Sequence, residues 1–314
     1  MKNTYKRVQA IDTDTGEILG NILLKEGSEQ LILKVVNEKQ SDAIKKKNSN
    51  NSDIIEHIQK NEGAFVHLIY KYTQPLMETL QSKCEGNNSN IHIIRFIQLA
   101  TYSTFGGKLF DKNWNRIKKS SLSKIWDVKN NRKSINETYE LLMECGYIYE
   151  TKEGYIMISE DLIVKGVIED FKRLKRNDAD LTYTRLFTKN IQDMYLGTKP
   201  TQRKQLANLF KVLPYINFKH NVFCENPIET DPKKLKLYTW SDLARLCGYD
   251  EKKQIARFKK DLWTLKIYGF DTIGEFKTQS GMAICINPKI YYSGDNIEDV
   301  NRLYVMFEMV QGKK

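Results

Sequence analysis

Side chains that could carry out catalysis are sparse in this chain of 314 residues. Its histidines are His57, His67, His92 and His220. None belongs to a His-x-His pair that could hold a metal ion, because Asn90-Ile91-His92-Ile93 contains a single imidazole. Each histidine is therefore interpreted as a core or surface side chain.

Other catalytic signatures are missing as well. No glycine-rich phosphate loop with its lysine is present, so ATP hydrolysis by the chain itself is not expected. The tyrosines lack the preceding basic and histidine residues that a tyrosine recombinase needs. The cysteines are scattered without a C-x-x-C pair, which predicts small buried side chains in a reducing compartment. They are Cys84, Cys145, Cys224, Cys247 and Cys285. We therefore expect no enzyme, no metal and no cofactor.

The charge balance points to a polyanionic partner. The formal net charge is +11, and a basic protein of this kind is attracted to nucleic acid. Acidic protein partners, or a lysine-rich composition typical of AT-rich genomes, are the alternatives. No apolar run approaches a membrane span, and the first residues lack the apolar core of a signal peptide, so we expect a cytoplasmic protein.

Residues 120–166 and 239–294 repeat one plan. Each has a polar start, a short amphipathic helix, a turn, a longer helix, two strands and a final glycine. The apolar positions Ile135, Leu142 and Cys145 correspond to Ile255, Leu262 and Leu265. The endings also correspond: Ser-Glu-Asp-Leu-Ile-Val-Lys-Gly at 159–166 matches Asn-Pro-Lys-Ile-Tyr-Tyr-Ser-Gly at 287–294. This order predicts two winged helix-turn-helix units.

In such a unit the first residues of the second helix lie nearest the base edges of the DNA major groove. Asparagine pairs with adenine and arginine with guanine, whereas lysine and serine usually contact phosphates. The candidates in the first unit are Asn130, Asn131, Arg132, Lys133, Ser134 and Asn136. Those in the second are Lys252, Lys253, Gln254, Arg257 and Lys260. Lys152 and Lys277 would extend from the wings. The alternative is that these are ordinary solvated faces of core helices.

Three further interpretations concern single residues. Trp126, Trp240 and Trp263 occupy helical core spacing and are predicted to pack inside. Arg203 and Lys204, at a predicted helix start, could bind a phosphate, although a simple surface helix is the favoured interpretation. Residues 45–52 read as a solvated tether or as a basic arm that contacts phosphates.

The predicted fold class is α+β, mainly helical, with two winged helix-turn-helix domains and a small N-terminal β unit. The expected domains are a small β unit (1–40), a flexible basic linker (41–53), a first winged-helix domain (54–166), linking helices (167–200) and a second winged-helix domain (201–314). Strands are predicted at 5–11, 18–24, 30–36, 147–150, 155–159 and within 270–286, with a short ribbon at 108–118. Helices are predicted at 54–82, 90–103, 120–128, 135–145, 167–181, 183–195, 202–213, 239–249 and 251–266. Ser134 is the expected N-cap of the helix at 135–145.

Residues 120–166 and the ending at 286–294 resemble the winged-helix replication proteins of Gram-positive plasmids and phages, including the RepL type. Two winged helices in tandem are similar to the architecture of theta-type plasmid initiators. The resemblance covers roughly residues 90–295. It implies a protein that binds repeated sites at an origin, helps open nearby AT-rich DNA and recruits the host helicase or its loader.

The sequence thus predicts a sequence-specific protein that binds double-stranded DNA, most simply a plasmid or phage replication initiator. A transcriptional repressor or regulator needs the same docking surface and stays open. An interaction protein that grips a host factor is a second alternative, and a homodimer is compatible with each of these functions.

Overall fold

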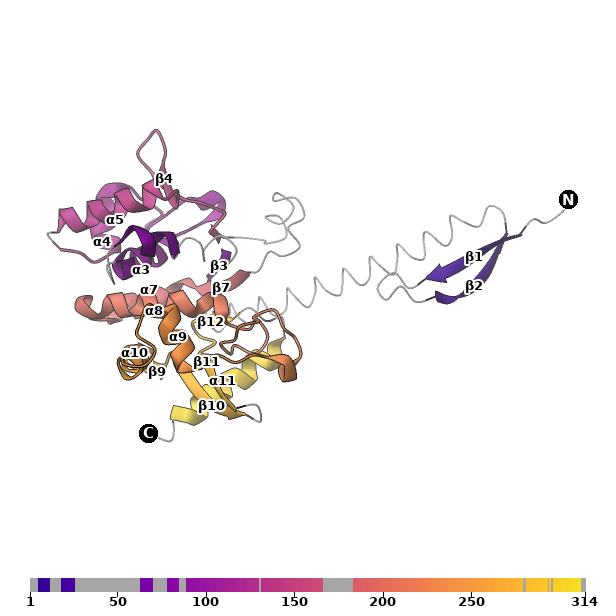
Figure 1. The fold of residues 1–314 in the computed structure, drawn as a ribbon. Helices are drawn as coiled ribbons and strands as arrows, with labels where there is room; N and C mark the ends of the chain where they lie inside the picture. Colours follow the sequence, from indigo (N-terminus) through magenta and orange to yellow (C-terminus); the bar gives the residue numbers. More distant parts are fainter. Residues whose placement is uncertain are drawn as a thin grey trace. The chain divides into compact units, whose positions relative to one another are not determined.

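The computed structural model describes residues 5–11, 18–25, 63–69, 78–84, 89–129, 131–165, 183–278, 281–292, 294 and 296–311 (Figure 1). Within-chain contacts divide the chain into residues 1–56 and residues 57–314. The first unit contains an antiparallel pair of strands, β1 (Tyr5–Ile11) and β2 (Ile18–Lys25), as predicted. The strand predicted at 30–36, the linker at 41–53 and the helix at 167–181 lie outside the described residues.

The second unit is organised around a four-stranded antiparallel sheet. Its strand order is β12-β7-β3-β6, formed by Tyr291–Tyr292, Tyr183–Phe187, Phe65–Ile69 and Ile163–Val164. The two outer strands, β6 and β12, belong to the two matching endings of the sequence repeat. Each copy of the repeat therefore contributes one edge strand to the same sheet. This shared sheet joins the two halves of the unit.

Two helix predictions are wrong at the inner strands. Residues 54–82 were expected to be helical, but β3 is a strand whose five residues are all buried. Residues 183–195 were expected to be one helix, but β7 precedes α7 (Thr188–Gly197). A short apolar run fits a buried strand and a buried helix equally well, and here pairing between Val66 and Leu186 decides for the strand.

The first half follows the predicted order of elements. After α3 (Ser89–Ala100) and the 3-10 helix η2 (Phe105–Gly107), residues 108–118 form a ribbon in which Phe110 bridges Arg116. Then come the 3-10 helix η3 (Lys119–Ser121), α4 (Leu122–Ile125), α5 (Arg132–Glu144), β4 (Ile148–Glu150) and β5 (Ile156–Ile158), and Lys108 of the ribbon bridges Met157 of β5. The helix predicted at 120–128 is thus shorter, since residues 119–121 are wound as a 3-10 turn.

The second half repeats this order after α7. It contains η4 (Pro200–Gln202), α8 (Arg203–Val212), η5 (Leu213–Tyr215), η6 (Pro232–Lys234), α9 (Trp240–Leu246) and α10 (Ile255–Trp263). Then follow β8 (Lys266–Ile267), β9 (Phe270–Asp271), β10 (Ile273–Thr278), β11 (Gly281–Ile286) and α11 (Ile297–Gln311). Here too a bridge, Val222 to Cys285, ties the segment before the helices to the second strand of the pair.

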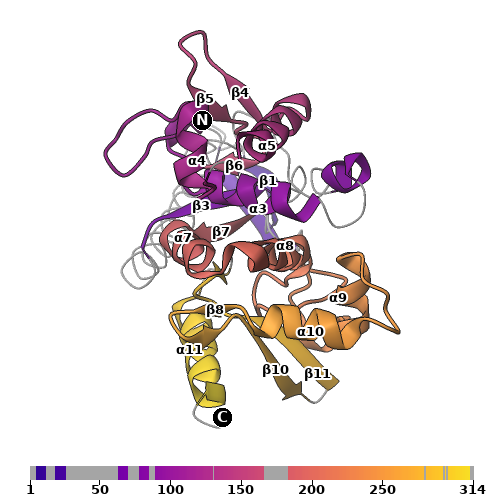
Figure 2. The same ribbon diagram turned by 90° about the vertical axis from the view of Figure 1, so that its left-hand side faces the viewer.

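One hydrophobic core runs through both halves of the second unit. The buried helices α3 and α8 pack against each other at its centre, and Asn90 Nδ2 of α3 donates to Asn208 Oδ1 of α8 at 3.2 Å. The strand pairs β4–β5 and β10–β11 lie at opposite ends of the unit in both views (Figures 1 and 2). Each half therefore presents its own surface while sharing the same interior.

Arg203 joins the halves. Its Nη2 donates to Asp127 Oδ2 at 2.6 Å, its Nη1 to the carbonyl of Trp126 at 3.2 Å, and its Nε to the carbonyl of Tyr195 at 3.1 Å. The arginine is buried, so it does not offer a phosphate site, and α8 is not a surface helix. Both interpretations of Arg203 from the sequence are therefore wrong. The side chain instead fixes the turn after α4.

Replacing Arg203 with methionine should lower the free energy of unfolding by about 3 kcal/mol, because several carbonyl groups and the Asp127 carboxylate lose a charged donor. Chemical denaturation measures this. The neighbouring exposed Lys204→Met variant is the control and should change stability by less than about 0.5 kcal/mol. Equal stability of the two variants would contradict the role given to Arg203.

Candidate nucleic-acid interface

The start of α5 carries the first set of predicted contacts. The helix begins at Arg132 and its N-cap is Asn131, whose side chain accepts from the Ser134 backbone N–H at 3.0 Å. The expected cap at Ser134 is thus wrong, and the Asn131 oxygen is used inside the protein. Arg132, Lys133 and Asn136 are exposed. Asn130 lies outside the described residues.

Arg95 anchors the first turns of α5. From α3, its Nη1 donates to the Ser134 carbonyl at 2.7 Å, to Ser134 Oγ at 3.0 Å and to Thr138 Oγ1 at 2.6 Å. Its guanidinium also lies over the ring of Trp126, 5.4 Å from the centroid. The Ser134 hydroxyl is therefore occupied and does not face outward as predicted. Sequence reasoning missed Arg95, because an arginine in an apolar helix carries no periodic signal.

The strand pair β4–β5 is tied to the same helix. The Tyr139 hydroxyl of α5 donates to Glu150 Oε2 of β4, and burial together with this carboxylate raises the pKa of Tyr139 to about 12. Lys152 is exposed in the turn between β4 and β5. Beside it, the cations of Arg116 and Lys118 lie over the Tyr155 ring, 4.6 Å and 4.7 Å from its centroid. The Tyr139–Glu150 hydrogen bond thus links α5 to the strand pair β4–β5.

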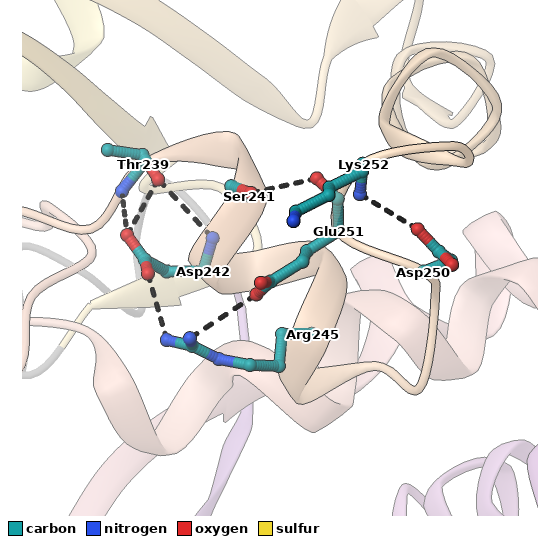
Figure 3. A network of polar contacts seen from close by, with 7 residues as sticks. All are labelled: Thr239, Ser241, Asp242, Arg245, Asp250, Glu251 and Lys252. Atoms are coloured by element: carbon teal, nitrogen blue, oxygen red, sulfur yellow. Dashed lines mark hydrogen bonds and ion pairs between the residues drawn. The ribbon is translucent and has the colours of Figure 1, made fainter.

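In the second half a polar network fixes the turn between α9 and α10 (Figure 3). Thr239 caps α9 in a capping box with Asp242, and Arg245 Nη2 donates to Asp242 Oδ1 at 2.9 Å. Arg245 Nη1 reaches Glu251 Oε2 at 3.3 Å, and Ser241 Oγ donates to the Glu251 carbonyl at 2.9 Å. The turn is consequently anchored to α9 at Glu251, by the side chains of Ser241 and Arg245.

The same turn delays the start of α10. Asp250 Oδ1 accepts from the backbone N–H groups of Lys252 and Lys253, at 2.9 Å and 2.8 Å, which lowers the pKa of its carboxyl group. Gln254 Oε1 accepts from the Asp250 N–H at 3.1 Å. The helix expected at 251–266 therefore spans 255–263, since these side chains satisfy the N–H groups in a turn instead. Lys252 and Lys253 precede the helix, and Gln254 is engaged internally.

Arg257 and Lys260 are exposed on α10, and Lys277 is exposed at the end of β10. Polar side chains connect α8 to α10, as they connect α3 to α5. Gln205 Nε2 donates to Asp261 Oδ1 at 2.8 Å, and the Tyr249 hydroxyl donates to Asp261 Oδ2 at 2.9 Å. The helices α5 and α10 are thus each anchored to one of the two central helices.

The tryptophan predictions hold for two of the three residues. Trp126 and Trp240 are buried, whereas Trp263 is 39% exposed. Trp263 contacts the edge of Trp240 at the end of α10, and Lys259 lies 5.5 Å from its ring centroid. A residue at the last turn of a helix follows the core spacing but extends past the core.

The described residues that were predicted to contact DNA lie in two groups. One is on α5 and in the turn between β4 and β5, and the other is on α10, in the turn before it and on β10.

Within the described residues no cluster of His, Cys, Asp and Glu side chains could hold a metal ion. In the same part of the chain, no helix combines the length and apolarity that crossing a bilayer requires. Comparisons with protein families, curated proteins and solved structures gave no match.

Replacing Arg95 with methionine should lower the free energy of unfolding by about 2–3 kcal/mol, since Ser134 and Thr138 lose their charged donor inside the protein. Thermal or chemical denaturation measures the change. Arg132→Met is the matched control, because this arginine is exposed and should alter stability by less than about 0.5 kcal/mol. If the two variants are equally stable, Arg95 does not support α5.

Proposed function

We propose that the chain is a sequence-specific protein that binds double-stranded DNA through two winged helices and acts as a plasmid or phage replication initiator. The observation that supports this is the set of exposed cations at the start of each second helix: Arg132 and Lys133 at α5, Lys252 and Lys253 before α10. Among the described residues, none of these cations has an acidic partner within salt-bridge distance. Unpaired cations at this position suit phosphate and base contacts.

Each half would supply one docking surface. The second helix enters the major groove and presents its first turn to the base edges, while the strand pair behind it reaches the backbone or minor groove. In the first half Arg132 is the candidate for guanine and Asn136 for adenine, with Lys133 and Lys152 on phosphates. In the second half Arg257 is the base-reading candidate, since Gln254 is held by the turn.

Binding would be bivalent. The halves share one core and one sheet, so docking of one surface fixes the position of the other. A rigid connection of this kind raises the effective concentration of the second surface for a correctly spaced site. The initiator role rests on the resemblance to plasmid and phage replication proteins; a repressor would use the same surfaces on a promoter.

Replacing Arg132 with alanine should weaken binding to the preferred site by about 1–3 kcal/mol and relax base preference at one position, because a bidentate contact is lost. Binding to a panel of single-base variants measures this. Lys234→Ala is the control, since Lys234 is exposed, lies near Asp231 at 4.0 Å and belongs to neither group of proposed DNA contacts. Unchanged affinity and preference in Arg132→Ala would refute the placement of the first recognition helix.

Replacing Lys253 with alanine should instead weaken binding to all sequences alike. One phosphate contact fewer should reduce the slope of log affinity against log salt by about 1. A salt titration on preferred and scrambled duplexes measures both effects. An altered base preference with an unchanged salt slope would show that Lys253 does not contact phosphate.

A further inference from the structure

A second, smaller hydrophobic cluster lies apart from the main core. Val222, Ala283, Cys285 and Phe307 are buried together between the strand pair β10–β11 and the helix α11. Leu235, Leu237 and Phe276 pack against this cluster and are only partly buried. Apolar side chains are thus gathered at a place where the protein itself does not cover them completely.

The uncovered side of this cluster faces a cavity of about 490 Å³. Its walls come from the segment 219–237, from β10–β11 and from α11, and most of the lining is apolar. This volume and lining fall within the range of about 300–1,000 Å³ that is typical of small-molecule sites. The cavity therefore has the size and the surface for a compact apolar ligand.

The rim is basic. Lys219, Lys233 and Arg302 border the cavity, and Asp299 borders it as well. Arg302 lies 4.0 Å from Asp299 and 3.9 Å from Glu298, so its charge is largely offset. Burial lowers the pKa of His220 and raises that of the Cys285 thiol to about 12, which leaves both lining groups neutral. Lys219 and Lys233 then leave the lining of the cavity with a net positive charge.

We propose that this cavity binds a small apolar anion: a molecule with an aromatic or aliphatic body of cavity size and one carboxylate or sulfonate group. The apolar body would lie against Leu237, Phe276 and Leu303, and the anion would meet Lys219 and Lys233. Such a site goes beyond DNA binding. It lies behind the strand pair that carries Lys277, so a bound ligand would hold these strands against α11.

The test uses 8-anilinonaphthalene-1-sulfonate, an apolar anion whose fluorescence rises in apolar sites, with the full chain and without DNA. We expect saturable binding at a single site, and binding of the uncharged N-phenyl-1-naphthylamine should be weaker by about tenfold or more. Lys233→Glu should weaken binding of the sulfonate by a similar factor of about ten while leaving the uncharged compound unaffected. Lys234→Glu, the adjacent lysine that does not line the cavity, is the charge-matched control and should bind as the unaltered chain does.

Leu235→Trp tests the location separately, because it fills the cavity and should abolish binding of both compounds. Hydrogen–deuterium exchange should show slower exchange in residues 273–286 and in α11 when the sulfonate is bound, and no change in α5. Equal losses in Lys233→Glu and Lys234→Glu, or protection confined to other segments, would overturn the proposal. Since no DNA is present, these results are independent of whether the chain binds DNA.

Discussion

Two buried helices, α3 and α8, lie against each other in the centre of the unit, and each supports one of the more exposed helices α5 and α10 through polar side chains. From α3, Arg95 holds the first turns of α5; from α8, Gln205 holds Asp261 of α10. Asn90 and Asn208 connect the two supports where they meet. Because a buried polar group is costly unless it is hydrogen-bonded, these contacts favour one relative arrangement of the helices.

This arrangement explains why the cations at the two surfaces can be unpaired. Charged groups that hold the interior together, such as Arg203 with Asp127, are saturated by carbonyl groups and a carboxylate. The exposed cations at the start of α5 and in the turn before α10 do not hold the interior together in this way. The protein thus separates buried arginines that determine its shape from exposed cations that remain available to a polyanion.

The sequence repeat predicted the order of helices and strands in both halves, because apolar spacing and turn residues determine those elements locally. It did not predict β3 and β7, whose strand state depends on pairing with each other and with strands far away in the sequence. It placed the start of α10 too early, since the side chains of Asp250 and Gln254 compete with the helix for N–H groups. The burial of Arg95 and Arg203 could not be predicted from the sequence either. Arginine is normally exposed, and only tertiary packing shows which arginines are enclosed.

The most direct test of the proposed function is selection of fragments that the full chain binds, from random and native-genome DNA, followed by a salt titration on the enriched fragment. The account predicts enrichment of repeats beside an AT-rich stretch and an affinity that falls steeply with salt. A single inverted repeat at a promoter would retain DNA docking and replace the initiator with a regulator. No enrichment, with weak and salt-insensitive binding, would contradict the central claim that α5 and α10 are DNA-recognition helices.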